Sequence, residues 1–158
     1  MAANISPKEF YSLVLEENPS RAYQCLSQIP LDSRQPYVSF RNEEGSSYLH
    51  GQTALHAAVR AGHAELVQLL LESNSDKDAR KNDGRTPIYL ASQNGHDKVV
   101  ELLLAAGADK DAATNNGATP IWTASFNGHH QVVEQLLATG ADKDAAKSDG
   151  ATPVFIAS

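Results

Sequence analysis

Apolar residues between positions 84 and 116 are spaced as in two short helices joined by a tight turn. The second of these helices is expected from about Asp97 to Ala105 and carries valine or leucine at Val99, Val100, Leu102, Leu103 and Leu104. So many apolar positions exceed what a surface helix with one buried stripe needs. They suit a helix that packs between two neighbours, so the pattern predicts a stack of helices.

The first helix of this segment is expected from Pro87 to about Asn94, and its neighbours supply start and stop signals. Thr86 can accept a backbone N–H as the N-cap, and proline at the first helical position lacks a donor that would have no partner there. Gly95 is expected to end the helix, because glycine adopts the left-handed conformation without steric cost. Small residues within the helix would let neighbouring helices approach closely.

The same pattern recurs at a fixed period of 33 residues. The spacing is seen in four glycines, each followed two residues later by threonine: Gly51, Gly84, Gly117 and Gly150. Residues 84–116 and 117–149 are identical at 22 of 33 positions. A duplicated structural unit explains this, so we expect three units at 51–83, 84–116 and 117–149, and a truncated fourth at 150–158.

The opening of each unit resembles the ankyrin repeat, in which Thr-Pro-Leu-His-x-Ala starts a helix–turn–helix pair. The openings read Thr53-Ala54-Leu55-His56-Ala57-Ala58, Thr86-Pro87-Ile88-Tyr89-Leu90-Ala91, Thr119-Pro120-Ile121-Trp122-Thr123-Ala124 and Thr152-Pro153-Val154-Phe155-Ile156-Ala157. The resemblance covers residues 51–158. It implies an all-α solenoid with β-turn or hairpin loops that binds another protein. The family's histidine is kept only at His56; aromatic rings replace it elsewhere and can fill the same space.

Residues 1–50 do not follow the period and are predicted to form a helical N-terminal cap, a degenerate first unit. Ser6 and Glu9 have the spacing of a capping box, so one helix is expected from Pro7 to about Glu17. A second is expected from about Ser20 to Gln28. Residues Tyr37–Phe40 are interpreted as a strand that leads through a turn into a hairpin. A separate docking element is the alternative role for this segment.

The chain stops at Ser158, inside the first helix of the fourth unit. The apolar side around Val132, Val133, Leu136 and Leu137 would then be covered by one short helix only. We expect either a fragment of a longer array or an end that frays. A fragment would leave open that the repeats regulate or target a larger enzyme or channel.

Composition and charge restrict the class of partner. The formal net charge is −6, and no basic stripe suited to nucleic acid is present. No run approaches the roughly 18 apolar residues of a membrane span, and no secretion signal is recognisable. The single cysteine, Cys25, lies in an apolar run and is predicted to be a buried structural thiol. We therefore expect a cytoplasmic monomer, with the nucleus as a second possible location, and no insertion into membranes.

Catalysis and metal binding find little support. His63, His96 and His129 recur once per unit, which separates them by roughly 10 Å, the packing distance of helices; zinc ligands lie about 2 Å from one ion. The pairs Asp76/Asp78, Asp109/Asp111 and Asp142/Asp144 are interpreted as solvated turn residues, since calcium needs about six to eight oxygens. No nucleotide or nucleophile motif occurs. We expect no enzyme activity, no cofactor and no bound metal.

The resemblance implies that a partner binds the concave face, formed by the turn tips and the exposed side of each first helix. Carried over by position, the tip residues are Asn82, Asp83, Arg85, Asn115, Asn116, Ala118, Ser148, Asp149 and Ala151. The helix residues are Arg60, Leu90, Gln93, Asn94, Thr123, Phe126 and Asn127. Phe126 is the sharpest candidate, either as an interface anchor or packed on Trp122 or the next hairpin. Arg60 and Arg85 could pair with acidic groups of a partner or remain solvated charges.

Overall fold

The computed structural model describes residues 5–15, 18–42, 51–145, 148 and 150, and the structural statements below concern these residues. Helices account for most of the regular structure. In chain order the elements are α1 (Pro7–Leu15), α2 (Pro19–Gln28), a 3-10 turn (Leu31–Ser33), α3 (Gln35–Val38), β1 (Arg41–Asn42), β2 (Gln52–Thr53), α4 (Ala54–Arg60), α5 (Ala64–Glu72), α6 (Pro87–Asn94), α7 (Asp97–Ala105), α8 (Pro120–Phe126) and α9 (His130–Ala138).

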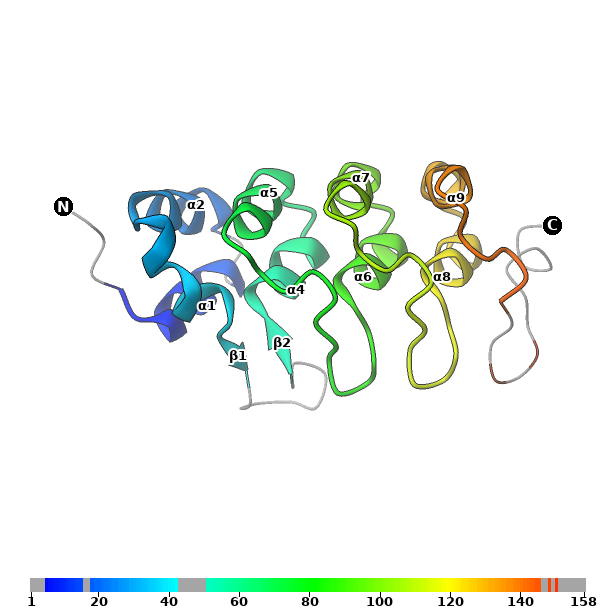
Figure 1. Ribbon diagram of the computed structural model, residues 1–158, viewed down its shortest axis with the longest axis horizontal. Helices are drawn as coiled ribbons and strands as arrows, with labels where there is room; N and C mark the ends of the chain where they lie inside the picture. Colours follow the sequence, from blue (N-terminus) through cyan, green and yellow to red (C-terminus); the bar gives the residue numbers. More distant parts are fainter. Residues whose placement is uncertain (1–4, 16–17, 43–50, 146–147, 149, 151–158) are drawn as a thin grey trace.

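The helices form two parallel rows, and loops project from one side of them (Figure 1). One row consists of α1, α4, α6 and α8, which contact one another in that order, and the other of α2, α5, α7 and α9. The predicted all-α stack of helix pairs is therefore confirmed. The two helices predicted within 84–116 have the expected bounds.

The core lies between the two rows and between successive pairs. Ala58, Ala91 and Ala124 are completely buried at equivalent positions of α4, α6 and α8. Their short side chains let these helices pack closely. In the second row Val100 and Leu103 are buried to the same degree, as expected for a helix between two neighbours.

Local signals define the helix ends as predicted. The hydroxyl of Thr86 accepts the backbone N–H of Tyr89 at 3.4 Å, and Thr119 caps α8 in the same way. Gly95 ends α6 with φ of +71°. A Cβ at this glycine would lie 2.5 Å from Nδ1 of His129, so the next unit packs directly on it.

Gly95→Ala is expected to destabilise the protein more than Gly128→Ala, although the two glycines have nearly the same φ, +71° and +75°. Both variants carry the strain of a left-handed alanine, about 1 kcal/mol. Only Gly95→Ala adds a clash, because a Cβ at Gly128 meets no described residue within 4 Å. Overpacking adds about 1–3 kcal/mol. Urea denaturation measures both, and equal losses would contradict the close contact with His129.

The N-terminal segment supplies the first helix pair. Ser6 and Glu9 form the predicted capping box: the Glu9 carboxylate accepts the N–H of Ser6 at 2.7 Å, and the Ser6 hydroxyl accepts that of Glu9 at 3.2 Å. Helix α1 is described as far as Leu15, and Glu17 lies outside the described residues. Cys25 is buried, as predicted.

The strand predicted at Tyr37–Phe40 is wrong. Residues Gln35–Val38 form α3, with Pro36 in its first turn, and the strand β1 begins only at Arg41. Tertiary contacts fix the turn: the Tyr37 ring meets Phe10 edge to face at 5.9 Å, and its hydroxyl donates to the Ile5 carbonyl at 2.9 Å. The predicted hairpin does exist, because β1 pairs antiparallel with β2.

At the other end, the predicted fourth unit lies outside the described residues except for Gly150. The apolar side of α9 is described. Val132 and Leu136 are buried, whereas Leu137 is 44% exposed.

Polar groups link each unit to the next. The Asp78 carboxylate accepts the backbone N–H of Asp109, and that of Asp111 accepts the N–H of Asp142, both at 2.8 Å. The interpretation of these pairs as solvated turn residues is therefore incomplete for Asp78 and Asp111, which also join units. The predicted structural role of the repeated histidines is confirmed at His96, whose Nε2 lies 3.0 Å from the Arg60 carbonyl oxygen.

Candidate functional site

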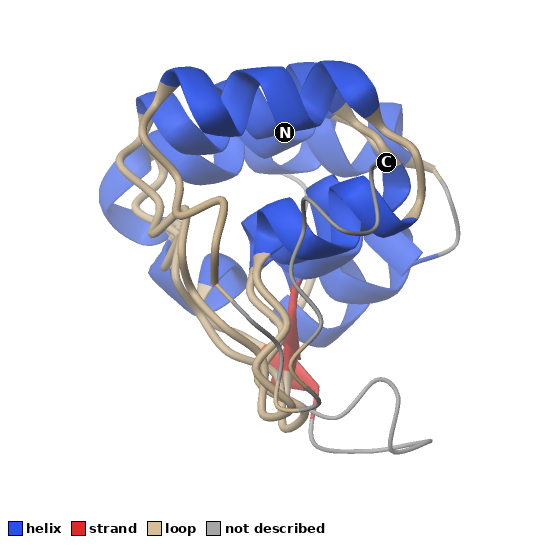
Figure 2. Cartoon of the chain, turned by 90° about the vertical axis from the view of Figure 1, so that its right-hand side faces the viewer, coloured by secondary structure: helices blue, strands red, loops and turns tan. Residues whose placement is uncertain are grey.

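Loops between successive helix pairs project together from the stack as fingers, defined here as residues 80–85, 113–118 and 148 (Figures 1 and 2). Backbone hydrogen bonds tie their tips together. The N–H of Asn115 donates to the Asp83 carbonyl at 3.1 Å, and the N–H of Ser148 donates to the Asn116 carbonyl at 3.1 Å. The side-chain amide of Asn115 also donates to the Asn82 carbonyl at 2.9 Å. Five of the predicted tip residues therefore form one edge: Asn82, Asp83, Asn115, Asn116 and Ser148.

A shallow hollow of about 250 Å³ lies between the first two fingers and the start of α6. It is lined by Asp83, Arg85, Tyr89, Thr114, Asn115 and Asn116. Nε of Arg85 lies 3.4 Å from the Asp83 carboxylate, and its guanidinium carbon is 5.9 Å from the centre of the Tyr89 ring. Arg85 is thus oriented by both neighbours, which restricts its rotamers before any partner arrives.

Polar side chains gather at the C-terminal ends of α4, α6 and α8. Asn94 and Asn127 are exposed at equivalent positions, while Arg60 and Gln93 are partly exposed. The amide of Asn94 donates to the Leu90 carbonyl at 2.7 Å, and that of Asn127 to the Thr123 carbonyl at 2.8 Å. These bonds fix the direction of each amide, so the remaining carboxamide oxygen is held at the surface.

Phe126 stands out at the end of α8. Its side chain is 62% exposed, yet its ring stacks on Trp122 with centroids 5.2 Å apart and planes 11° from parallel. The interpretation that Phe126 packs on Trp122 is therefore confirmed, and its role as an interface anchor stays a prediction. The stack orients the Phe126 ring while leaving most of it in contact with solvent.

The predicted exposure of two residues, Leu90 in α6 and Thr123 in α8, is wrong. Leu90 is 1% and Thr123 is 2% exposed, because this position lies where α4, α6 and α8 pack on one another. The Thr123 hydroxyl instead accepts the amide of Asn127 at 3.3 Å. The predicted tip residue Ala118 is also buried, at 1%. Asp149 and Ala151 lie outside the described residues.

Sequence reasoning missed Tyr89 and Thr114 in the hollow between fingers. Tyr89 occupies the position of the family's histidine, so it was assigned to the interior, and only 6% of it is exposed. Thr114 was not considered. Its hydroxyl binds the backbone N–H of Ala118 at 3.1 Å and thereby shapes the finger; a threonine four residues before Ala118 in a turn was the available signal.

Among the described residues, no group of three or more histidine, cysteine, aspartate or glutamate side chains is arranged to hold a metal ion. No helix in the described part of the chain has the length and apolar character needed to cross a membrane.

Residues 32–114 match the family model for ankyrin repeats in three copies, and residues 116–148 match the model for an ankyrin repeat. The chain belongs to the ankyrin repeat family. Ankyrin repeats are generally non-catalytic modules for protein–protein interaction. A search of curated proteins gave no match. The ankyrin match begins within residues 1–50, and the division into a cap and numbered units stays a prediction.

Proposed function

We propose that this ankyrin protein is a scaffold or adaptor that binds a partner protein through its finger tips and the exposed ends of α6 and α8. The observation that carries the proposal is Phe126. At 62% exposure it is the most exposed of the large apolar side chains in the described part of the chain. Aromatic residues at such positions are typical anchors of interfaces.

The surroundings of Phe126 support an interface. Stacking on Trp122 reduces the rotamer freedom that Phe126 would lose on binding. The side-chain amide of Asn127, the next residue in the sequence, offers polar contacts at the rim of the proposed interface. Arg85, already oriented by Asp83 and Tyr89, presents a guanidinium suited to a carboxylate of the partner.

The proposal also covers the location of the protein in the cell, its oligomeric state and its lack of catalytic activity. We place a monomer in the cytoplasm or nucleus, without a catalytic step of its own. A lone buried thiol such as Cys25 suits a reducing compartment, where disulfides are rare.

Phe126→Ala combined with Arg85→Ala is expected to reduce recovery of the partner at least about tenfold, the effect of losing an interface anchor. The measurement is affinity purification with the intact chain as bait, quantified by mass spectrometry. Leu137→Ala is the matched control, because it shortens a side chain that is 44% exposed on α9, in the other row. Equal recovery by the double variant and the wild type would place the binding surface elsewhere. Circular dichroism confirms that each bait is folded.

A further inference from the structure

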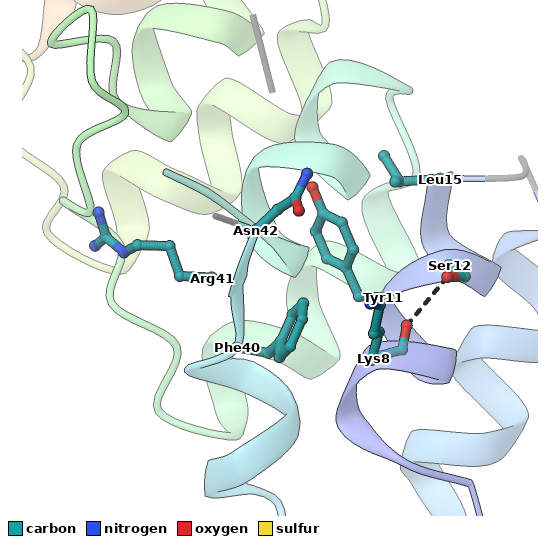
Figure 3. A pocket seen from close by; sticks show the side chains of 7 residues that line it. All are labelled: Lys8, Tyr11, Ser12, Leu15, Phe40, Arg41 and Asn42. Atoms are coloured by element: carbon teal, nitrogen blue, oxygen red, sulfur yellow. Dashed lines mark hydrogen bonds between the residues drawn. The ribbon is translucent and has the colours of Figure 1, made fainter. Parts of the chain in front are cut away.

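Phe126 presents an open apolar ring at the end of α8, where 62% of its side chain is exposed. The hollow between α1 and β1 gives a contrast, because its aromatic floor is already covered. Tyr11 is 3% exposed there, and its ring packs on that of Phe40 with centroids 5.4 Å apart (Figure 3). A partner therefore buries more apolar area at Phe126 than at Tyr11.

Two side-chain oxygens accompany Phe126, one at the end of each of two successive helices. Asn94 ends α6, Asn127 follows α8 at the equivalent position, and both residues are exposed. Each amide nitrogen donates to the backbone carbonyl four residues earlier, at 2.7 Å and 2.8 Å. A carbonyl accepts but never donates, so the nitrogen faces the helix and the Oδ1 atom faces away from it. Within the described part of the chain no group donates to either oxygen, so both can accept from a partner.

The two oxygens repeat with the packing distance of the helices that carry them. Helices α6 and α8 are equivalent in successive units and pack on each other, so Asn94 and Asn127 lie about 10 Å apart. In an α-helix, residues seven apart lie on one side and are separated by about 10.5 Å. On an extended strand, side chains of one face are separated by roughly 6.6 Å or 13 Å. The spacing of the two acceptors therefore matches a helix better than a strand.

Electrostatics at these helix ends favours positively charged donors. The C-terminal ends of α6 and α8 lie on the same side of the stack, and a helix carries partial negative charge at that end. Residues 86–158 contain eight acidic and four basic residues. Helices α8 and α9 contain no lysine or arginine. Arginine or lysine side chains of a partner therefore suit the two oxygens better than neutral donors do.

We propose that the partner segment that contacts Phe126 is a basic amphipathic helix, an inference that rests on the proposed function. This helix lies across the ends of α6 and α8, and two of its basic side chains, seven residues apart, donate to Asn94 and Asn127. Apolar side chains on the same side of the helix cover the Phe126 ring. Stacking on Trp122 already orients that ring, so little rotamer freedom is lost when the helix binds.

The test is a titration of the intact chain with a helical peptide, followed by amide chemical shifts in ¹H–¹⁵N spectra. The peptide is stapled and alanine-based, with two arginines seven residues apart and leucines on the same side of the helix. We expect shifts at residues 93–95 and 126–128, and a weaker complex at high salt because exposed charges are screened. Absence of shifts at about 1 mM peptide would contradict the proposal.

Two further peptides test the spacing and the helix. Placing the arginines nine residues apart keeps the composition but turns them to opposite sides of the helix, and we expect the dissociation constant to rise at least about fivefold. An unstapled peptide with a central proline cannot form a continuous helix and is expected to bind at least about tenfold more weakly. If either peptide binds as tightly as the first one, the partner is not recognised as a helix with this spacing.

Variants of the protein connect the peptide to the two amides. Asn94→Leu combined with Asn127→Leu removes both acceptors at nearly unchanged size and is expected to weaken binding of the first peptide about tenfold or more. Gln131→Leu is the matched control, because it makes a similar change at an exposed position of α9, in the other row, and should leave the affinity unchanged. Equal affinities of the double variant and this control would overturn the proposal. The peptide comparisons use the unaltered protein, so they decide the matter even if a variant does not fold.

Failure of this inference and failure of the proposed function give different results. If the first peptide does not bind while Phe126→Ala with Arg85→Ala still lowers recovery of the partner, the surface is correct and the basic helix is wrong. If that double variant recovers the partner as well as the wild type does, the proposed function fails and this inference fails with it.

Discussion

Leu103→Ala is expected to lower the free energy of unfolding by about 3 kcal/mol or more, as in other leucine-to-alanine changes in well-packed cores. Leu103 is completely buried in α7, which packs between α5 and α9. Removal of its side chain leaves a cavity that neither neighbour can close without moving its own partner. Urea denaturation followed by circular dichroism measures the change.

Leu137→Ala provides the comparison within the same kind of helix. Leu137 lies in α9 and is already 44% exposed, so its truncation removes little buried area and is expected to cost about 1 kcal/mol or less. Similar losses for the two variants would show that burial between helix pairs does not govern stability here.

Acidification from pH 7 to pH 5 is expected to remove about 2 kcal/mol of stability through His56 alone. His56 is completely buried. Its Nδ1 accepts the backbone N–H of Thr53 at 3.2 Å, so the neutral ring carries its proton on Nε2, 3.4 Å from the Arg85 carbonyl oxygen. Burial lowers the pKa of His56 from 6.5 to about 4.

The sign follows from the two pKa values of His56. Between pH 6.5 and about 4 the unfolded chain binds the proton and the folded chain does not, so stability falls as the pH is lowered through this range. Urea midpoints at pH 7 and pH 5 measure the difference. His56→Tyr, which introduces the residue found at the equivalent Tyr89, is expected to reduce it.

The control for His56 is His130→Gln, which removes an exposed histidine at the start of α9. This variant is expected to keep the pH dependence of the wild type. If His56→Tyr and His130→Gln respond to pH alike, His56 is not the group responsible.

The helix pairs could be predicted from sequence because their signals are local. Helix α6 begins after the N-cap Thr86, with the fixed φ angle of Pro87, and it ends at the left-handed Gly95. None of these signals depends on distant contacts. The exposure of Phe126 was also within reach, since the equivalent positions of the earlier units carry the polar residues Arg60 and Gln93.

Features set by distant contacts could not be predicted in the same way. Tyr37 turns into α3 because it meets Phe10 and Ile5, far away in the chain. Leu90 and Thr123 vary between copies, as surface residues do, yet the adjacent helices bury them.

The carboxylates of Asp78 and Asp111 each reach forward by one unit and no further. At both described joints the earlier unit therefore offers the same acceptor, and the later unit presents the same donor. A gene that gained or lost 33 codons within 84–149 would encode a chain in which these joints form again unchanged. The array can in this way lengthen or shorten by whole modules during evolution, while the residues that a guest protein meets diverge independently in each module.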